Sequence, residues 1–311
     1  MTENTTAKSP SLDNLEIGVG AWAWGDRFFW NYGGSFNDQD IEAAFRTSLD
    51  AGINFIDTAE VYGQGRSEQI LGQLMQNTNK PVLVATKFFP YPWRLARRSL
   101  QNALDHSLKR LQVDQVFLYQ IHWPLLLLPI GTLMDAMADA VKSGKITAVG
   151  VSNFSKSQTQ RAYTALARHN IPLASNQVEY HLLNRQIEKN GLLARCRAMG
   201  VRVIAYSPLA QGLLTGKYSP ESPPPGVRGP RYASLLKNIQ PLIALMKEIG
   251  KGQGDKTPGQ VALNWLICKG ALPIPGAKNL AQIQQNNGSI GWRLTEDEIA
   301  ALDAASDEVA K

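Results

Sequence analysis

The chain has few cysteines and no long apolar run, and each shortage excludes a class of protein. Its 311 residues include only two cysteines, Cys196 and Cys268, which lie far apart and next to helical patterns. Two isolated cysteines support neither a disulfide framework nor a metal site, so we expect two reduced thiols and no bound metal. No apolar run reaches the roughly 18 residues that a membrane-spanning helix needs, and we expect no membrane association.

The first residues lack the features of a targeting segment. They are polar, have no apolar core or cleavage site, and are not rich in arginine. We therefore expect a cytoplasmic protein in which residues 1–14 form a flexible segment. The net charge is +6, but the basic residues are scattered, which favours anionic small molecules over a nucleic acid as the partner.

The apolar share of 44% is that of a globular protein with a sizeable core. Along the chain, short strand-like runs alternate with helical patterns, and no Gly/Ser-rich linker divides them. The expected strands cover 15–20, 54–56, 82–87, 116–122, 146–152, 174–178, 202–206 and 271–275. Alternation of this kind predicts an α/β protein, a (β/α)8 TIM barrel that forms a single domain over residues 15–311.

Helical spacing of apolar residues defines the segments between these strands. The expected helices cover 38–51, 67–75, 95–111, 132–143, 158–168, 186–199, 242–250, 258–269, 280–286 and 295–306. Ser67 is a plausible N-cap, and Thr295 with Glu298 forms a capping box. Residues 207–241 are rich in proline and glycine and are expected to be mostly loop.

Ionisable side chains stand at the ends of three successive strands. Asp57 and Tyr62 follow the second strand, Lys87 ends the third and His122 ends the fourth. The carboxyl ends of barrel strands hold the chemistry of TIM barrels, so we expect these four to converge. An ammonium beside a phenol would lower the pKa of Tyr62, with Asp57 holding Lys87 charged, and His122 could polarise a carbonyl oxygen.

Later strand ends offer groups suited to a cofactor. Ser152, Asn153 and Gln177 could bind an amide, and Tyr206 offers a flat face for a ring. Glycines and backbone amides at 209–216 and 276–280 could receive phosphates, with Lys278 adding positive charge. Several tryptophans stand beside the same strand ends and are candidates for an apolar substrate pocket: Trp22, Trp24, Trp30 and Trp123.

Taken together, these segments resemble the aldo-keto reductase superfamily over about Leu15 to Ala304. The resemblance rests on Lys87, His122 and the motifs GINFIDTAEVYG, GVSNF, SNQVEYH, AYSPLAQGLLTGKY and PIPGAKN, in that family's order. It implies a TIM barrel that binds NADPH and transfers its hydride to an aldehyde or ketone. By this resemblance Tyr62 is the proton donor, Asp57 and Lys87 tune it, and His122 orients the carbonyl.

The resemblance also implies the cofactor contacts. Ser152, Asn153 and Gln177 would hold the carboxamide while Tyr206 stacks on the ring. The pyrophosphate would pass Ser207, Leu209, Gln211 and Gly212, and the adenosine end would meet Gly276, Lys278, Gln282, Gln285 and Asn286. Many relatives have an arginine where Gln282 stands, so the preference for NADPH over NADH depends on Lys278. Many also have a hairpin before the first strand, which is missing here.

Two other functions fit parts of the same pattern. Potassium-channel β subunits resemble this fold and would bind NADPH as regulatory subunits with slow turnover. A barrel lyase would instead use Lys87 to form a Schiff base. The sequence leaves open the substrate, its stereochemistry and whether the protein is a monomer or a weak homo-oligomer. Some relatives with this overall arrangement reduce pyridoxal.

Overall fold

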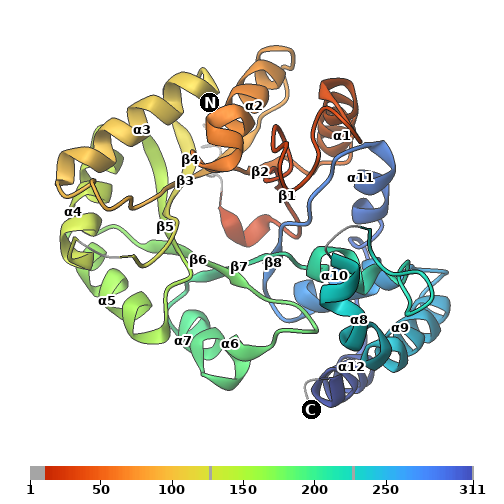
Figure 1. Cartoon of the computed structure of the whole chain (residues 1–311). Coiled ribbons are helices and arrows are strands. Elements are labelled where there is room, and N and C mark those ends of the chain that lie inside the picture. Colours follow the sequence, from red (N-terminus) through yellow and green to blue (C-terminus); the bar gives the residue numbers. More distant parts are fainter. Residues whose placement is uncertain (1–10, 126–127, 226–227, 310–311) are drawn as a thin grey trace, which may run out of the picture.

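The computed structural model describes residues 11–125, 128–225 and 228–309. Eight parallel strands follow one another around a barrel in chain order, with helices outside them (Figure 1). The strands are β1 Val19–Gly20, β2 Phe55–Asp57, β3 Leu83–Phe88, β4 Val116–Ile121, β5 Ile146–Ser152, β6 Leu173–Glu179, β7 Arg202–Tyr206 and β8 Leu272–Pro273. The predicted (β/α)8 barrel and its single domain are confirmed.

The barrel closes where β1 meets β8. The Gly18 and Gly20 amides donate to the carbonyls of Pro273 and Pro275, each at 3.0 Å, and Gly20 bridges to Gly276. A Cβ on Gly20 would lie 2.9 Å from the Ile274 carbonyl oxygen, so only glycine permits this approach. Both strands are shorter than predicted. Pro273 in β8 and Pro275 just after it have no N–H to donate to a ladder.

Helices cover the outside of the barrel, and four of them begin with capping boxes, at Asn37, Ser155, Thr257 and Thr295. The helices are α1 Asp38–Asp50, α2 Arg66–Gln76, α3 Arg97–Leu111, α4 Ile130–Lys142, α5 Lys156–Ala167, α6 Gln186–Lys189, α7 Leu192–Ala198, α8 Arg228–Asn238, α9 Gln240–Gly252, α10 Pro258–Cys268, α11 Leu280–Asn287 and α12 Glu296–Val309. Short 3-10 turns are η1 Leu12–Asn14, η2 Tyr62–Gly65 and η3 Ala210–Thr215. No helix in the described ranges is long and apolar enough to cross a membrane.

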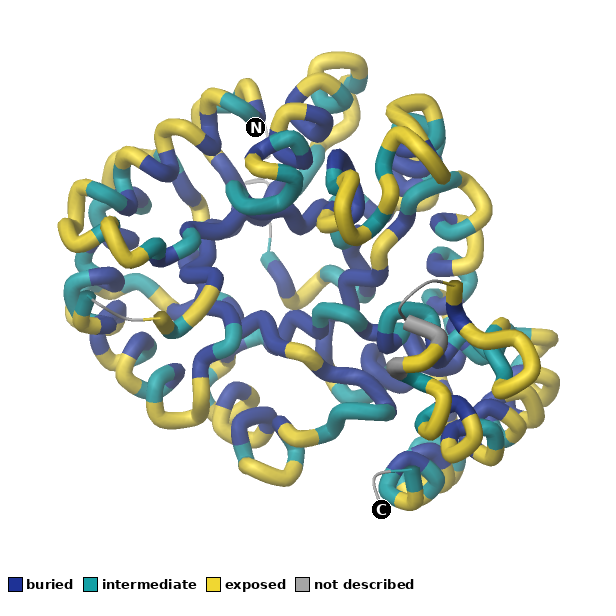
Figure 2. The backbone as a smooth tube through the Cα atoms, in the orientation of Figure 1, coloured by how far each residue is buried: buried dark blue, intermediate teal, exposed yellow. Residues whose placement is uncertain are grey.

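Alternation along the strands sorts side chains between two environments. Outward residues join the core under the helices, as Ile56, Val84 and Ile121 do. Inward residues at the lower end of the barrel form a second apolar cluster that includes Phe55, Ala85, Leu118, Ile204 and Leu272. Figure 2 shows the strands as a buried ring at the centre of the molecule. The inward positions above this apolar layer are polar, and they form the site.

The structure corrects four local predictions. Ser67 lies inside α2, not at its N-cap, because its hydroxyl donates to the Ala21 carbonyl at 2.9 Å. The helix predicted over 186–199 is broken by Gly191, whose φ of 75° lies in the left-handed region. The segment 207–241 holds η3 and α8, so it is less irregular than its proline content indicates.

The fourth correction concerns the start of the chain. Residues 11–14 are ordered: Ser11 caps η1, and Leu12 is buried against the lower apolar cluster of the barrel. The predicted flexible segment therefore does not extend through residue 14, because Leu12 gains apolar burial at the barrel floor. The rest of that segment, residues 1–10, lies outside the described residues.

Candidate active site

A buried ion pair forms the centre of the barrel mouth. The Lys87 ammonium lies 2.5 Å from Asp57 Oδ2, and both side chains are almost fully buried. Lys87 Nζ also donates to the Thr58 carbonyl at 2.8 Å and to the Tyr62 hydroxyl at 3.2 Å. Burial by itself would lower the pKa of Lys87, but the charge of Asp57 and these hydrogen bonds raise it above its ordinary value.

Because Lys87 stays protonated, its nitrogen has no lone pair with which to attack a carbonyl. A Schiff-base lysine must be neutral when it acts as a nucleophile. The three acceptors around Nζ also use all three of its protons. This arrangement opposes the lyase hypothesis and suits a lysine that acts as a fixed positive charge.

Two glutamine amides complete the surroundings of Asp57. Gln177 and Gln120 donate to Asp57 Oδ1 at 2.7 and 3.2 Å, so both carboxylate oxygens are hydrogen-bonded. The carboxylate fixes the orientation of Gln177, since only its NH2 group can face an acceptor. Its carbonyl oxygen remains available to a ligand amide, which is compatible with the predicted role at a carboxamide.

Tyr62 reaches the ion pair from the turn after β2. In η2, Gly63 and Gln64 have φ of 54° and 57°, a left-handed turn that sends the chain on into α2. The Tyr62 ring centroid lies 4.8 Å from Lys87 Nζ. Burial raises the pKa of Tyr62 and outweighs the lowering by Lys87, so the pKa is raised overall and the predicted lowering is wrong. The phenol therefore keeps its proton at neutral pH and can donate it.

His122 follows β4 and lies beside Tyr62, with ring centroids 5.7 Å apart. Burial and the charge of Lys87 lower the pKa of His122 to about 2. The imidazole is neutral at physiological pH, so one ring nitrogen donates and the other accepts. Within the described part of the chain, the buried Nδ1 has no hydrogen-bond partner. A neutral imidazole suits a donor that orients a carbonyl oxygen without protonating it fully.

Asn153 connects three strand ends around the same mouth. Its Nδ2 donates to the His122 carbonyl and to Ser152 Oγ, both at 3.1 Å, and its Oδ1 accepts from Tyr206 at 3.0 Å. The Tyr206 hydroxyl is therefore fixed against Asn153 at the end of β7. Burial, the charge of Glu179 and Tyr62 raise the pKa of Tyr206 to about 12, so it stays neutral.

The loop after β7 is strained in the way that anion-binding loops often are. Ser207, Ala210 and Gln211 have φ of 50°, 47° and 55°, and Gly212 has 94°. Turns that contain left-handed residues can present backbone amides to an anion. In this loop the amides of Ala210, Gly212 and Leu214 donate to carbonyls of the loop itself, at 2.8, 2.9 and 3.2 Å. The Tyr232 hydroxyl of α8 donates to Gln211 Oε1 at 3.1 Å and so connects α8 to this loop. Leu209, which was also predicted to lie along the pyrophosphate, is part of the same loop.

The residues predicted for the adenosine end lie between β8 and α11. The Gln282 side chain accepts from the Lys278 amide at 2.9 Å, and Asn286 donates to the Gly276 carbonyl at 3.4 Å. Gln285 bonds to Thr257 at the start of α10. These contacts shape the loop around Lys278, whose ammonium lies 5.0 Å from the Trp30 ring centroid.

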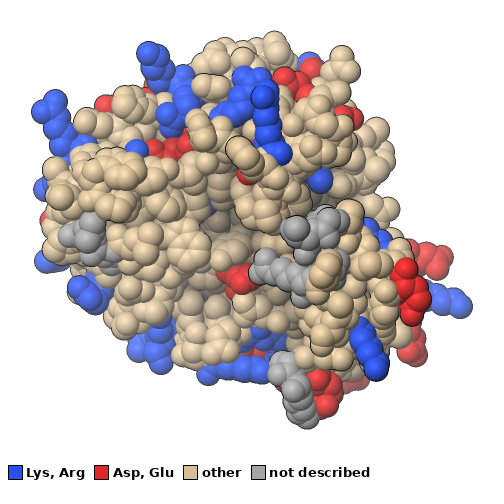
Figure 3. All heavy atoms as spheres, viewed as in Figure 1, with Lys and Arg blue, Asp and Glu red and all other residues tan. Residues whose placement is uncertain are grey.

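Aromatic side chains surround the mouth, and Figure 3 shows a hollow at the centre of this face. Trp22 lies 6.4 Å from the Tyr62 ring and packs edge to face with Trp30 at 5.4 Å. Trp123 stacks on His122 at 6.4 Å.

Trp24 does not belong to this group: it is fully buried and its indole donates to the Ala277 carbonyl. Its assignment to the substrate pocket is therefore wrong, since it fills the core between the first loop and the one after β8.

Two residues of the site were missed from the sequence. Gln120 stands two positions before His122, and the period-two alternation of a strand places both on the inner face, so this signal was available. Phe89 lies 5.7 Å from the His122 ring, and the same alternation places it with Lys87 on the inner side while Phe88 packs outward, so this signal was available as well. Cys196 and Cys268 are free, and no cluster of His, Cys, Asp or Glu that could hold a metal occurs in the described ranges.

Comparison with known proteins identifies the family. The model of the Aldo/keto reductase family matches residues 16–307. The chain is 40% identical over 320 residues to a chloroplastic pyridoxal reductase of Arabidopsis thaliana, covering 98% of this chain and 86% of that protein. It is 32% identical over 278 residues to a methylglyoxal reductase of Escherichia coli, covering 89% and 88%.

Solved structures agree as well. A crystal structure of an aldo/keto reductase from Klebsiella pneumoniae, in complex with NADP and acetate, matches with a TM-score of 0.74 and 31% identity over 93% of this chain and 90% of that one. The family match spans nearly the whole chain and includes every strand whose end contributes to the site. This chain therefore belongs to the aldo/keto reductase family and is an oxidoreductase of that family.

Proposed function

We propose that the chain reduces an aldehyde or ketone to an alcohol with NADPH, and that Tyr62 is the proton donor. The observation that carries this proposal is the position of the Tyr62 hydroxyl, 3.2 Å from the buried Lys87 ammonium and next to neutral His122. A phenol with a raised pKa is protonated and ready to donate. The nearby ammonium then stabilises the phenolate that remains.

In this mechanism the chain positions a carbonyl and delivers one proton. A ring N–H of His122 donates to the carbonyl oxygen, and Tyr62 gives that oxygen its proton while a hydride reaches the carbonyl carbon. NADPH supplies that hydride when it is bound. Asp57 keeps Lys87 charged and in place throughout, because its other oxygen is held by Gln120 and Gln177.

The residues present fit a nicotinamide cofactor. Ser152, Asn153 and the free carbonyl of Gln177 would hold the carboxamide, and Tyr206, fixed through Asn153, would lie against the ring. The loop that contains Gln211 would receive the pyrophosphate, and Lys278 the 2′-phosphate. Lys278→Ala is then expected to weaken NADPH binding more than NADH binding, measured by quenching of tryptophan fluorescence.

An aromatic aldehyde such as pyridoxal is the substrate class we favour. The mouth is bordered by Trp22, Trp30 and Trp123, which offer flat apolar surface to a ring. A relative with 40% identity over 98% of this chain is a pyridoxal reductase. A regulatory subunit of the potassium-channel type is not favoured by any of the relatives compared above.

The test follows the absorbance of NADPH in the presence of pyridoxal and small aromatic aldehydes. Tyr62→Phe is expected to lower kcat/KM by roughly 100-fold or more, since it removes the general acid. Tyr163→Phe makes the same change on α5, away from the mouth, and serves as the control. Equal rates for Tyr62→Phe and wild type would refute the mechanism. A single turnover followed by tight retention of the cofactor would favour the regulatory role.

A further inference from the structure

One carboxylate at the mouth has no place in the mechanism above. Glu179 is the last residue of β6, and its backbone pairs with that of Tyr206 on β7. Strand alternation puts Glu179 on the same face as Gln177, which contacts Asp57 inside the barrel. Its side chain is 45% exposed. Figure 3 shows acidic atoms at the edge of the central hollow.

Two donors from the loop after β6 hold this carboxylate in one orientation. The Leu183 amide donates to His181 Nδ1 at 3.1 Å, so the imidazole proton is on Nε2 and faces Glu179 Oε1 at 3.4 Å. Asn184 donates to the other oxygen, Oε2, at 3.1 Å. The hydrogen bond from His181 is the main cause that lowers the pKa of Glu179, so the group is ionised near neutral pH.

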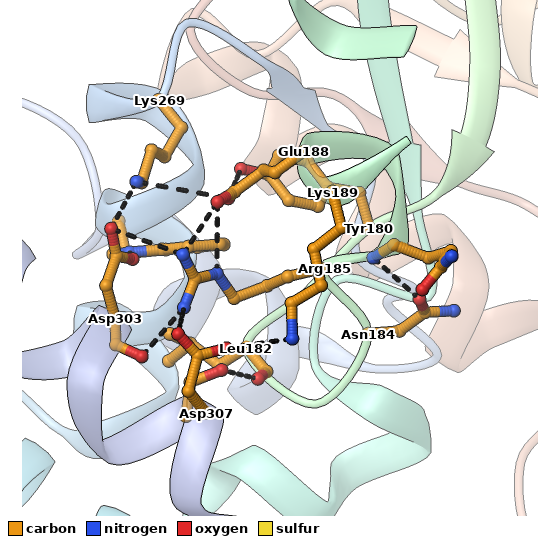
Figure 4. Close-up of polar contacts among 12 residues, drawn as sticks. Tyr180, Leu182, Asn184, Arg185, Glu188, Lys189, Lys269, Asp303 and Asp307 are labelled. Atoms are coloured by element: carbon orange, nitrogen blue, oxygen red, sulfur yellow. Dashed lines mark hydrogen bonds and ion pairs between the residues drawn. The ribbon is translucent and has the colours of Figure 1, made fainter. Parts of the chain in front are cut away.

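The loop that carries these donors is anchored at its far end to the C-terminal helix. The Arg185 guanidinium is 10% exposed; it donates to the Asp303 carbonyl at 2.7 Å and lies 3.3 Å from Asp307 Oδ2. It also bonds to Glu188 at 2.7 Å. Figure 4 shows Arg185 between these carboxylates, with Asn184 pointing away from them. The donors around Glu179 therefore belong to a loop with little freedom to move.

Glu179 differs from Asp57 and Glu60, two acids that also follow barrel strands, in having no lysine or arginine partner among the described residues. Asp57 is paired with Lys87, and Glu60 with Arg94 at 2.5 Å. In the described part of the chain, no lysine or arginine forms an ion pair with Glu179. The mouth therefore combines aromatic walls with a fixed, partly exposed carboxylate on the residue that pairs with Tyr206.

We infer that Glu179 is a specificity-determining residue that favours aldehydes bearing a positive charge, such as a pyridinium, over anionic ones. This inference rests on the proposed reductase function. A carboxylate at the edge of the mouth attracts a cationic substrate and repels an anionic one, and low-dielectric walls strengthen both effects. We expect an effect of about tenfold on kcat/KM, which corresponds to about 1.4 kcal/mol.

The test uses three aldehydes that share one ring shape and differ in charge: 4-formyl-1-methylpyridinium, benzaldehyde and 4-carboxybenzaldehyde. The pyridinium carbonyl is more electrophilic for chemical reasons, so the informative quantity is the ratio of variant to wild type for each substrate. Glu179→Gln is expected to lower kcat/KM about tenfold for the cation, mainly through KM. The same variant should change kcat/KM for benzaldehyde by less than twofold and raise kcat/KM for 4-carboxybenzaldehyde severalfold.

Two further variants complete the design. Glu179→Asp keeps the charge and is expected to keep most of the preference for the cation. Glu248→Gln removes the same charge from an exposed position on α9 and should leave kcat/KM unchanged for all three substrates. Equal ratios for the three substrates in Glu179→Gln would overturn this inference while the reductase function stands. Failure of the wild type to reduce any of the three would overturn the proposed function, and this inference with it.

Discussion

The buried ion pair at the mouth allows a sharp test by replacing Lys87 with methionine. Methionine has nearly the volume of lysine without its charge, so the variant leaves the Asp57 carboxylate buried with only Gln120 and Gln177 as donors. Removing one partner of a buried pair costs about 3–5 kcal/mol, because the remaining charge is uncompensated. That is a large share of the roughly 5–15 kcal/mol by which native proteins are stable.

The chain offers a matched comparison on its surface. Lys80 lies 2.6 Å from Asp50, almost the separation of Lys87 from Asp57, but its side chain is 51% exposed and that of Asp50 is 71% exposed. Water solvates the exposed pair, so Lys80→Met is expected to cost no more than about 1 kcal/mol. The same substitution at two pairs of similar geometry thus isolates the effect of burial.

The assay is urea unfolding at pH 7, followed by circular dichroism, for the single variants Lys87→Met, Lys80→Met and Asp57→Asn and for the double variant that combines Asp57→Asn with Lys87→Met. The double variant leaves no buried charge and is expected to lose less stability than Lys87→Met alone. It should remain inactive as a reductase, because the cation beside Tyr62 is gone. A loss of less than 1 kcal/mol in Lys87→Met, or losses that simply add in the double variant, would refute this account of the pair.

Other predictions concern pH, packing and the C-terminal helix. The folded-state pKa of His122, about 2, lies below the ordinary 6.5, so the unfolded chain binds the extra proton first as pH falls, and stability is lost below pH 6.5. This contribution amounts to at most about 1.4 kcal/mol per pH unit and should vanish in His122→Gln, as urea unfolding between pH 5 and 8 would show. Gly72→Ala should cost about 1–3 kcal/mol, because the new Cβ would lie 2.6 Å from the backbone oxygen of Arg110 in α3. At Gly131 the new Cβ would meet only the Arg168 side chain, at 3.5 Å, so Gly131→Ala should stabilise the protein by up to about 1 kcal/mol. Thermal unfolding of the two glycine variants would reveal opposite signs. Arg185→Met should cost about 2 kcal/mol, because its charged hydrogen bonds to Glu188 and to the Asp303 carbonyl are lost while Lys269 and Lys189 still pair with the carboxylates. Lys189→Met, at a 53% exposed position, should cost less than about 1 kcal/mol; equal losses in urea would contradict the buried role of the arginine.

Local patterns in the sequence were enough to predict the barrel. Short β-prone runs separated by helical spacing allow little else than parallel strands with helices outside them, and β5 and β7 have the predicted bounds. The same topology brings the carboxyl ends of β2, β3 and β4 together. That is why Asp57, Lys87 and His122 could be placed in one site before any contact was known.

The tertiary structure decided what those residues do for one another. Whether Trp24 lines a pocket or fills the core depends on the Ala277 carbonyl, which is 253 positions away. The pKa of Tyr62 depends on the balance between burial and Lys87, and the sequence indicated only the second of these. The placing of Gln177 against Asp57 likewise joins residues 120 positions apart. Periodicity fixes which face a side chain occupies, because it is local. Burial and the choice of hydrogen-bond partner are set by distant segments that meet only when the barrel closes.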